Sequence, residues 1–374
     1  MNERERFLRT CRFKPVDRPP LWPPLAIWSK TFERWRKEGY LDEYQVELAG
    51  EHTDKILDLS DFLGCDRFDE VGIYFGFCPG FEHKIIEETE EYITYRNHEG
   101  ITMKEFKEYR DSSMPQFLDF PVKTRQDYED VKYRWQLNFE ERFPENWEEK
   151  CKIWKHRKIP LRMWADREGG FFGPLRNLFG FEKLMYLFYD DPDFLEEVMD
   201  DKAELMIKIL DRILEDIQFD YFVFWEDMAS NHGPLISPEM FEKFMVPRYK
   251  KVTEFLRSNG VDIIMVDSDG EISELIPLWL EAGVNGIWPF EVQSGMDVVK
   301  VREEYEDLII VGGIDKRVLA KTKEDIDKEI YRVAPLFEKG GYIPWLDHSV
   351  PPDVSFDNYL YFYNKLESVM SGRE

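Results

Sequence analysis

Acidic residues follow six short apolar segments of the sequence, at the point where each segment ends. They are Asp166, Glu168, Glu226, Asp227, Asp267, Asp269, Glu291, Asp315 and Asp347. If these segments are parallel strands, their carboxyl ends meet at one mouth. Crowded carboxylates repel one another, so they need protons, cations, a metal ion or a cationic ligand. An acid after a strand can instead cap the next helix, and Asp269 and Asp315 fit that role best.

One histidine, His348, also stands at the end of such a segment, beside Asp347. A hydrogen-bonded structural histidine is the plain interpretation, and two chemical ones compete with it. As a neutral imidazole, His348 is a metal ligand together with Asp267 and Asp269, a set that suits zinc, manganese or iron. As a proton shuttle, it has a pKa that neighbouring carboxylates raise.

Two further groups of residues could contact a ligand. Arg167 opens the segment REGGFFGP, where glycines allow close backbone approach and the guanidinium offers a fork for a carboxylate or phosphate. The alternative is a tight turn in which Arg167 pairs with Asp166. Tryptophans also fall at the ends of three apolar segments, at positions 225, 288 and 345. Trp225, Trp288 and Trp345 either contact a flat aromatic or macrocyclic ligand or pack over the end of the sheet.

Alternating strands and helices must position these residues. Six apolar segments are each followed by an amphipathic helical segment, which is typical of a parallel sheet with right-handed crossovers. With two more strands at 19–26 and 66–75, the pattern predicts an α/β fold, a (β/α)₈ TIM barrel. An open doubly wound sheet is the rival, but no G-x-G-x-x-G follows a strand. The six segments are 159–164, 220–225, 262–266, 284–290, 308–313 and 341–346, with helices at 193–216, 238–258, 271–282, 295–305 and 322–338.

The N-terminal third departs from this pattern. Residues 83–106 alternate in polarity around a turn at residues 97–100, which predicts a β-hairpin inserted into the barrel. We treat the chain, residues 1–374, as one barrel domain with this insertion.

The amino-acid composition argues against some classes of binding partner. The 76 acidic residues exceed the 50 basic ones, giving a net charge of −26. Such a surface repels phosphate backbones and anionic lipid, so neither nucleic acid nor membrane is an expected partner. Four cysteines form no CxxC pair, and neither an apolar run of eighteen residues nor the apolar core of a signal peptide is present. We therefore expect a cytoplasmic protein.

Three segments carry a resemblance to a known family. They are RERFLRTCRFKPVDRPPLWP at the start, WEDMASNHGPLISPEMFEKFMVPRYKKV at 225–252 and GGYIPWLDHSVPPDVSFDNY at 340–359. Each resembles the uroporphyrinogen decarboxylase superfamily, whose last strand carries a pattern near L-G-H-G followed by a proline-rich turn. The resemblance spans nearly the whole chain and implies the same barrel. It does not specify one activity.

One branch of the superfamily removes carboxyl groups from a tetrapyrrole without a cofactor. The resemblance to this branch implies an R-Q-A-G-R segment after the first strand, but this chain has PPLAIWSKTFERWRKEGY there. The positive clamp for a polyanionic substrate is therefore missing, although Asp69 loosely matches the substrate-binding aspartate. A decarboxylase acting on a carboxylated substrate is our second hypothesis.

The other branch comprises corrinoid-dependent methyltransferases, which exchange a methyl group with cobalamin on a partner protein. Members that methylate thiols bind zinc through His-x-Cys-Gly after the fifth strand and a cysteine on the last strand. Residues 267–270, Asp-Ser-Asp-Gly, and His348 stand at the matching places. The resemblance thus implies an Asp267/Asp269/His348 metal site with Glu226 as a fourth ligand, holding zinc or another divalent metal.

Our first hypothesis is therefore a methyltransferase of this branch, acting on a small methylated substrate with a corrinoid protein. A metal, or acid catalysis by Glu226, Asp227 or His348, would activate the leaving atom. A non-catalytic ligand-binding barrel is the third hypothesis, and superfamily relatives suggest a homodimer. The expected substrate-binding residues are Arg167, Trp225, Trp288, Glu291, Asp315 and Asp69.

Overall fold

The computed structural model describes residues 1–23, 26–41, 64–109 and 114–373. Its centre is a seven-stranded parallel sheet in which neighbours in space follow the order of the chain. This order results when each crossover leads to the adjacent strand, as in a (β/α)₈ barrel. The strands are β1 (Asp69–Gly72), β6 (Leu161–Trp164), β7 (Tyr221–Trp225), β10 (Ile263–Asp267), β11 (Gly286–Trp288), β12 (Ile309–Val311) and β13 (Tyr342–Ile343).

An N-terminal segment lies between the two edges of this sheet. The N–H of Asp66, just before β1, donates to the carbonyl of Leu21 over 2.7 Å. On the other side, Ile27 forms a parallel bridge with Val350, which follows β13. The segment thereby takes the place of the eighth strand, and the predicted TIM barrel is confirmed. Within the predicted strand 19–26, residues 24–25 lie outside the described residues.

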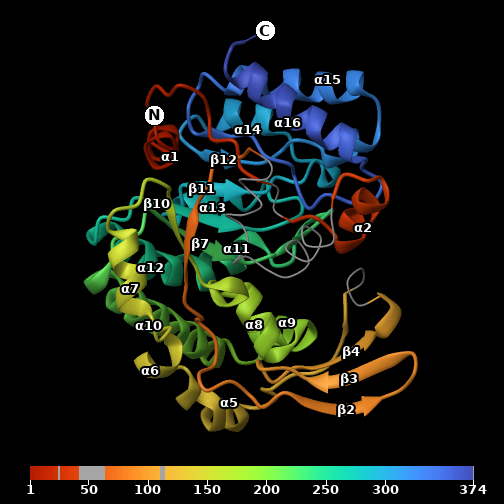
Figure 1. Ribbon diagram of the computed structural model, residues 1–374. Coiled ribbons are helices and arrows are strands. Elements are labelled where there is room, and N and C mark those ends of the chain that lie inside the picture. The colour runs from red at the N-terminus through yellow and green to blue at the C-terminus, as the bar shows by residue number, and fades with distance from the viewer. Residues whose placement is uncertain (24–25, 42–63, 110–113, 374) are drawn as a thin grey trace.

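Helices cover the outside of the barrel (Figure 1). The long helix α10 starts as the sequence predicts, because the Asp191 side chain accepts a hydrogen bond from the Phe194 N–H and Pro192 occupies the first turn. The helices are α1 (Glu3–Cys11), α2 (Ser29–Lys37), α5 (Arg125–Val131), α6 (Phe139–Arg142), α7 (Trp147–Trp154), α8 (Phe172–Phe179), α9 (Phe181–Asp190), α10 (Pro192–Asp216), α11 (Pro238–Met240), α12 (Val246–Ser258), α13 (Ile276–Glu281), α14 (Val298–Glu304), α15 (Lys323–Val333) and α16 (Phe356–Met370).

The segment predicted as one helix at 238–258 is divided. A π-helical turn, Phe241–Met245, separates α11 from α12. Pro247 in the first turn of α12 lacks an N–H, so the regular α-helical bonding pattern cannot continue through this point. The π turn sets the direction of α12, which carries Tyr249 toward the barrel.

The insertion is larger than a hairpin. Four antiparallel strands pair in the order β2-β3-β4-β5 and project from the barrel beside α8 and α9 (Figure 1). The turn between β3 and β4 is held by the Asn97 side chain, which accepts hydrogen bonds from two backbone N–H groups. The range 83–106 covers three of the strands, β2 (Lys84–Glu88), β3 (Tyr92–Arg96) and β4 (Thr102–Phe106), and β5 (Gln116–Asp119) extends the sheet beyond it.

The barrel interior is filled mainly by apolar side chains. Alternate strand residues point inward, so Tyr221 and Val223 on β7 face Ile263 and Met265 on β10. One charged side chain, Arg162, lies among them. The outward positions join the helices in a second, larger cluster. A packed interior of this kind leaves the strand ends as the place for a site.

All four cysteines are buried and free of disulfide bonds, as their spacing suggested. Within the ranges that the structure describes, no helix has both the length and the apolar character needed to cross a membrane.

Candidate active site at the barrel mouth

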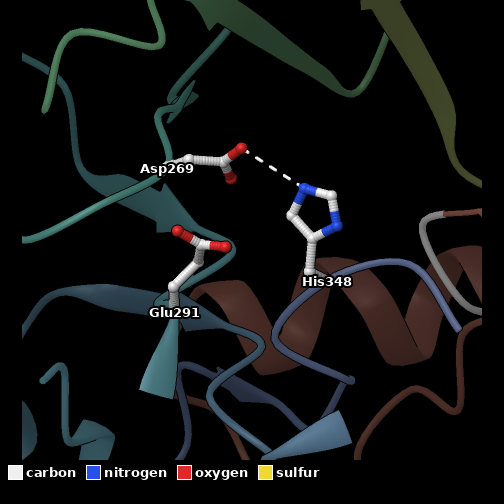
Figure 2. Close-up of side chains that lie close together, drawn as sticks. All are labelled: Asp269, Glu291 and His348. Atoms are coloured by element: carbon white, nitrogen blue, oxygen red, sulfur yellow. Dashed lines mark ion pairs between the residues drawn. The ribbon is translucent and has the colours of Figure 1, made fainter. Parts of the chain in front are cut away.

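Three side chains converge at the carboxyl end of the barrel (Figure 2). Asp269 follows β10, Glu291 follows β11 and His348 follows β13. One possible ligand atom from each lies within 4.8 Å of the others. His348 Nε2 lies 3.3 Å from Asp269 Oδ2. The three residues are far apart in sequence but follow strands of one end of the sheet order, β10-β11-β12-β13, so this order brings them together.

Hydrogen bonds from the neighbouring loops hold the carboxylate of Glu291 in place. Glu291 accepts hydrogen bonds from the N–H of Gly270 (3.0 Å) and the hydroxyl of Ser294 (3.2 Å). Gly270 has a φ of +92°, and a Cβ there would lie 2.6 Å from the Ala229 carbonyl oxygen. Only glycine fits this position without a backbone shift. The glycine thus brings the loop after β10 up to Glu291.

A buried aspartate, Asp347, ties the surrounding loops together. It is 1% exposed and accepts hydrogen bonds from the N–H groups of Val292 and Lys316, each over 3.0 Å. Burial raises the pKa of its carboxyl group, although those two hydrogen bonds act to lower it. Asp347 therefore fixes the loops after β11 and β12 next to His348.

The contacts of His348 determine which ring nitrogen carries a proton and how strongly the ring holds it. In the neutral imidazole, the Ser349 N–H donates to Nδ1 over 2.7 Å and the single ring proton lies on Nε2, facing Asp269. Burial opposes the charged imidazolium, but the hydrogen bond and negative charge of Asp269 outweigh burial and raise the pKa of His348. His348 is therefore placed to donate a proton.

Asp267 is not part of the three-residue cluster, contrary to the predicted Asp267/Asp269/His348 set. It is the last residue of β10, and Asp269 follows in the loop after that strand. The cluster found among the described residues contains Asp269 and not Asp267. Glu291, expected to bind substrate, takes its place. Burial, Asp269 and Asp227 raise the pKa of Asp267 well above its usual value. Asp267 thus remains at the mouth as a carboxyl group that tends to keep its proton.

Glu226, expected as an acid or ligand, is fully buried and points away from the mouth. Its carboxylate accepts hydrogen bonds from the N–H groups at the start of α8, Phe171 (2.8 Å), Phe172 (2.6 Å) and Gly173 (3.1 Å), and from the hydroxyl of Tyr249. Burial raises the pKa of this carboxyl group, and the four hydrogen bonds oppose that rise. Glu226 thus anchors α8 to β7.

The neighbouring residues Asp227 and Trp225 do reach the mouth. Asp227 has a φ of +46° and pairs with Arg176 over 3.0 Å. The guanidinium carbons of Arg167 and Arg176 each lie 5.8 Å from the centre of the Trp225 ring. Arg167 is exposed, and no described carboxylate pairs with it. These residues form a charged, aromatic edge that a substrate can contact.

Three expected substrate-binding residues have structural contacts instead. Asp69 begins β1, so it lies at the opposite end of the barrel, where the Trp154 indole N–H donates to it over 2.7 Å. Asp315 caps the turn after β12 and accepts two hydrogen bonds of 2.8 Å from the Arg317 guanidinium. Trp288 is 4% exposed and packs against Trp345 inside the barrel.

The sequence did not indicate two charged groups near the mouth. Arg162 on β6 pairs with Glu70 inside the barrel, and the inward alternation of β6 was the signal for it. Glu99 comes from the turn between β3 and β4, and its Oε2 lies 3.4 Å from the Asn177 amide on α8. Burial and the nearby Glu168 raise the pKa of Glu99 to about 7. No local pattern brings Glu99 to the barrel.

The family comparison covers the part of the chain that carries this site. The model of the family described as Uroporphyrinogen decarboxylase (URO-D) matches residues 175–368, which is more than half of the chain. This chain belongs to the uroporphyrinogen decarboxylase family. The site residues Asp269, Glu291 and His348 all lie within the matched range. The resemblance drawn from the sequence is thus confirmed.

The comparison with solved structures includes one that shares the fold of this chain. A methyltransferase from Methanosarcina mazei has a TM-score of 0.62 at 15% identity, covering 98% of this chain and 99% of its own. A protein from Listeria monocytogenes, assigned as a vitamin-B12-independent methionine synthase, has a TM-score of 0.38 at 12% identity and covers 96% and 98%. A search of curated protein sequences gave no match. At 15% identity, the similarity to the Methanosarcina mazei structure shows a shared fold and nothing further.

Proposed function

We propose that this protein is a corrinoid-dependent methyltransferase that moves a methyl group between a small methylated compound and a cobalamin on a partner protein. The observation that carries the proposal is the cluster of Asp269, Glu291 and His348 at the mouth of a barrel of this family. Side chains of Asp269 and His348 keep 33% and 30% of their surface exposed. A substrate, and a partner above it, can therefore reach the cluster from outside the barrel.

His348 supplies the proton that the reaction needs. When the bond from the methyl carbon to oxygen or nitrogen breaks, the electron pair stays on that atom, and the methyl group passes to the corrinoid. His348 acts here as the imidazolium, which the negative charge of Asp269 favours, and its Nε2 proton passes to the leaving atom and leaves a neutral imidazole. Asp269 faces the nitrogen that carries this proton.

The same residues fit a divalent cation. The 3.3 Å between Asp269 Oδ2 and His348 Nε2 is close to the roughly 3.4 Å that separates two ligands of a tetrahedral ion. Two carboxylates and an imidazole suit zinc, manganese or iron. Such an ion would polarise the leaving oxygen or nitrogen. Because the Nε2 proton occupies the place of the cation, proton donation and cation binding exclude each other at this atom.

The edge formed by Trp225, Arg167 and Asp227 is the proposed substrate contact. Trp225 ends β7, next to β10, so its ring stands beside the strand that leads to Asp269. A methylated compound resting there has its leaving atom over the cluster and its methyl group toward the opening.

The test is methyl transfer followed by the absorption of the corrin. Purified protein is mixed with cob(I)alamin and a panel of methylated amines, methyl ethers and methyl thioethers, and its metal content is measured in parallel. We expect one class of donor to convert cob(I)alamin to methylcobalamin at a rate that depends on His348. His348→Gln should lower this rate by about 10²-fold or more.

His156→Gln is the matched control, because His156 is exposed and lies before β6, at the other end of the barrel. It should leave the rate unchanged. Loss of carbon dioxide from a carboxylated substrate, with no change in the corrin spectrum across the panel, would overturn the proposal in favour of a decarboxylase. Tight ligand binding that needs His348, without turnover of any donor, would favour a binding protein.

A further inference from the structure

A second polar site lies inside the barrel, below the mouth. It is a cavity of about 10 Å³, the space of roughly one water molecule. Val223 and Met265 line it, and these residues point inward one layer below Trp225 and Asp267. The cavity is therefore separate from the Asp269, Glu291 and His348 cluster but stands directly under the proposed substrate position.

Two residues that line the cavity each carry a buried polar atom without a hydrogen-bond partner among the described residues. These atoms are the hydroxyl of Tyr221 and the indole Nε1 of Trp288. Tyr221 is 1% exposed and Trp288 is 4% exposed, so bulk water does not satisfy them. Leaving buried polar groups unpaired is costly, and native structures rarely do so without reason. Two such groups around one cavity indicate that something binds there.

Arg162 supplies the third polar group of the cavity wall. Its Nε and Nη2 donate to Glu70, and no described residue accepts from Nη1. The remaining wall is aromatic, with Trp22, Phe68 and Trp345. The available groups are thus donors in an otherwise apolar space, since an indole and a guanidinium can only donate and a phenol donates well.

Charge decides what kind of acceptor fits. Glu70 already pairs with Arg162, so the cavity wall carries no unbalanced positive charge. An anion in the cavity would therefore have no free cation to balance it, which is unfavourable in a buried site. A neutral oxygen, by contrast, accepts hydrogen bonds without adding charge.

We propose that the barrel interior is a subsite for one neutral oxygen acceptor, bound by Tyr221, Trp288 and Arg162. In the resting protein the oxygen is that of a water. In the complex it belongs to a hydroxyl, ether, carbonyl or amide group of the substrate. This second statement rests on the proposed function and narrows its substrate to small methylated compounds that carry such an oxygen.

The first experiment is a thermal unfolding comparison of the full chain. Tyr221→Phe removes only the hydroxyl, and Tyr342→Phe is the control, because the equally buried Tyr342 hydroxyl donates to the Gly312 carbonyl over 3.0 Å. If Tyr221 is paired to an oxygen, both variants should lower the midpoint by about 2 °C. A higher midpoint for Tyr221→Phe alone would mean an unpaired hydroxyl and would overturn the proposal.

The second experiment uses acetamide and acetate as probes of equal shape, neutral and anionic, in saturation-transfer NMR. We expect acetamide to bind the wild type and the Tyr342→Phe variant, with at least 5-fold weaker binding to Tyr221→Phe, and acetate to bind weakly throughout. A crystal structure should place an oxygen within hydrogen-bond distance of Tyr221 and Trp288. A water that acetamide never displaces, or equal binding of the two probes, would overturn the substrate subsite. None of these measurements needs corrinoid or turnover, so they stand apart from the test of methyl transfer.

Discussion

Asp269 sets the protonation of His348, and this pair is the chemical centre of the proposed site. The imidazole is buried enough for desolvation to disfavour its charge, yet the carboxylate 3.3 Å away more than compensates. Without Asp269 the remaining neighbours include Lys316, whose positive charge lowers the pKa of His348. The raised pKa of His348 therefore depends most on Asp269, and Glu291 contributes less in the same direction.

Replacing the Asp269 carboxylate should be visible by NMR. Asp269→Asn in metal-free protein should lower the pKa of His348, because the amide keeps the shape but not the charge. The imidazole titration is the measurement, and Asp262→Asn, which removes an exposed carboxylate before β10, is the control. An unchanged pKa in Asp269→Asn would show that the pair does not form in solution.

Glu99 offers a second titration at the residue scale. Its folded pKa of about 7 exceeds the unfolded value of 4.5. Between these values the folded chain holds a proton that the unfolded chain releases, so the free energy of unfolding falls as pH rises through this window. Glu99→Gln should remove this fall. The difference in the free energy of unfolding between wild type and variant should therefore change by about 1–3 kcal/mol between pH 4.5 and pH 8.

Urea unfolding at several pH values tests the Glu99 prediction. Glu91→Gln serves as the control, since Glu91 is an exposed carboxylate of the same small sheet. Parallel stability curves for wild type and Glu99→Gln would contradict the burial of Glu99 against the barrel.

At the scale of elements, Glu226 joins β7 to the first turn of α8. Three backbone N–H groups and one phenol point at a single carboxylate, and the positive end of the helix adds to their effect. Gly173 must lack a side chain, because a Cβ there would lie 2.4 Å from the Trp225 ring. This junction therefore positions Trp225 and Asp227 at the mouth.

Glu226→Gln should weaken the junction without changing its shape. The amide NH₂ would face N–H donors and leave them unsatisfied, which should lower the free energy of unfolding by about 2–4 kcal/mol. Denaturant unfolding measures the loss. Glu242→Gln, on the exposed face of the π turn, should change it by less than about 0.5 kcal/mol. Equal stability of the two variants would rule out the anchoring role.

The sequence predicts elements better than side-chain directions. The apolar segments and helical periods identified six strands of the barrel, because buried parallel strands read as continuous apolar runs. These strands are β6, β7, β10, β11, β12 and β13. The site was predicted only in outline, since a shift of one residue at a strand end turns a side chain to another face. For this reason the prediction placed Asp267 in the cluster where the structure has Glu291. It also placed Glu226 at the mouth, although that side chain is buried against α8. Asp69 begins its strand instead of ending it, which no local pattern signals.

At the scale of the whole molecule, closure of the barrel decides which residues meet. Leu21 and Ile27 bridge the edges of the sheet, and the sheet order then brings the ends of β10, β11 and β13 together. The insertion adds Glu99 from outside the barrel. Contacts between segments so distant in sequence follow from the topology and have no signature in composition or period.

The closed fold should also protect all four thiols. The four thiols are each at most 8% exposed and form no disulfide bond; they are Cys11, Cys65, Cys78 and Cys151. Ellman's reagent should therefore react slowly with the native protein and with four thiols per chain in denaturant. Rapid reaction of any thiol before unfolding would contradict the packing described here.

The central claim is that His348, held by Asp269 at the barrel mouth, supports methyl transfer to a corrinoid. Its most direct test is the rate at which cob(I)alamin becomes methylcobalamin with the best donor of the panel, compared among wild type, His348→Gln and His156→Gln. We expect the His348 variant to lose about 10²-fold or more while the His156 variant keeps the wild-type rate. Equal rates in all three proteins, or no methylcobalamin from any donor, would contradict the account.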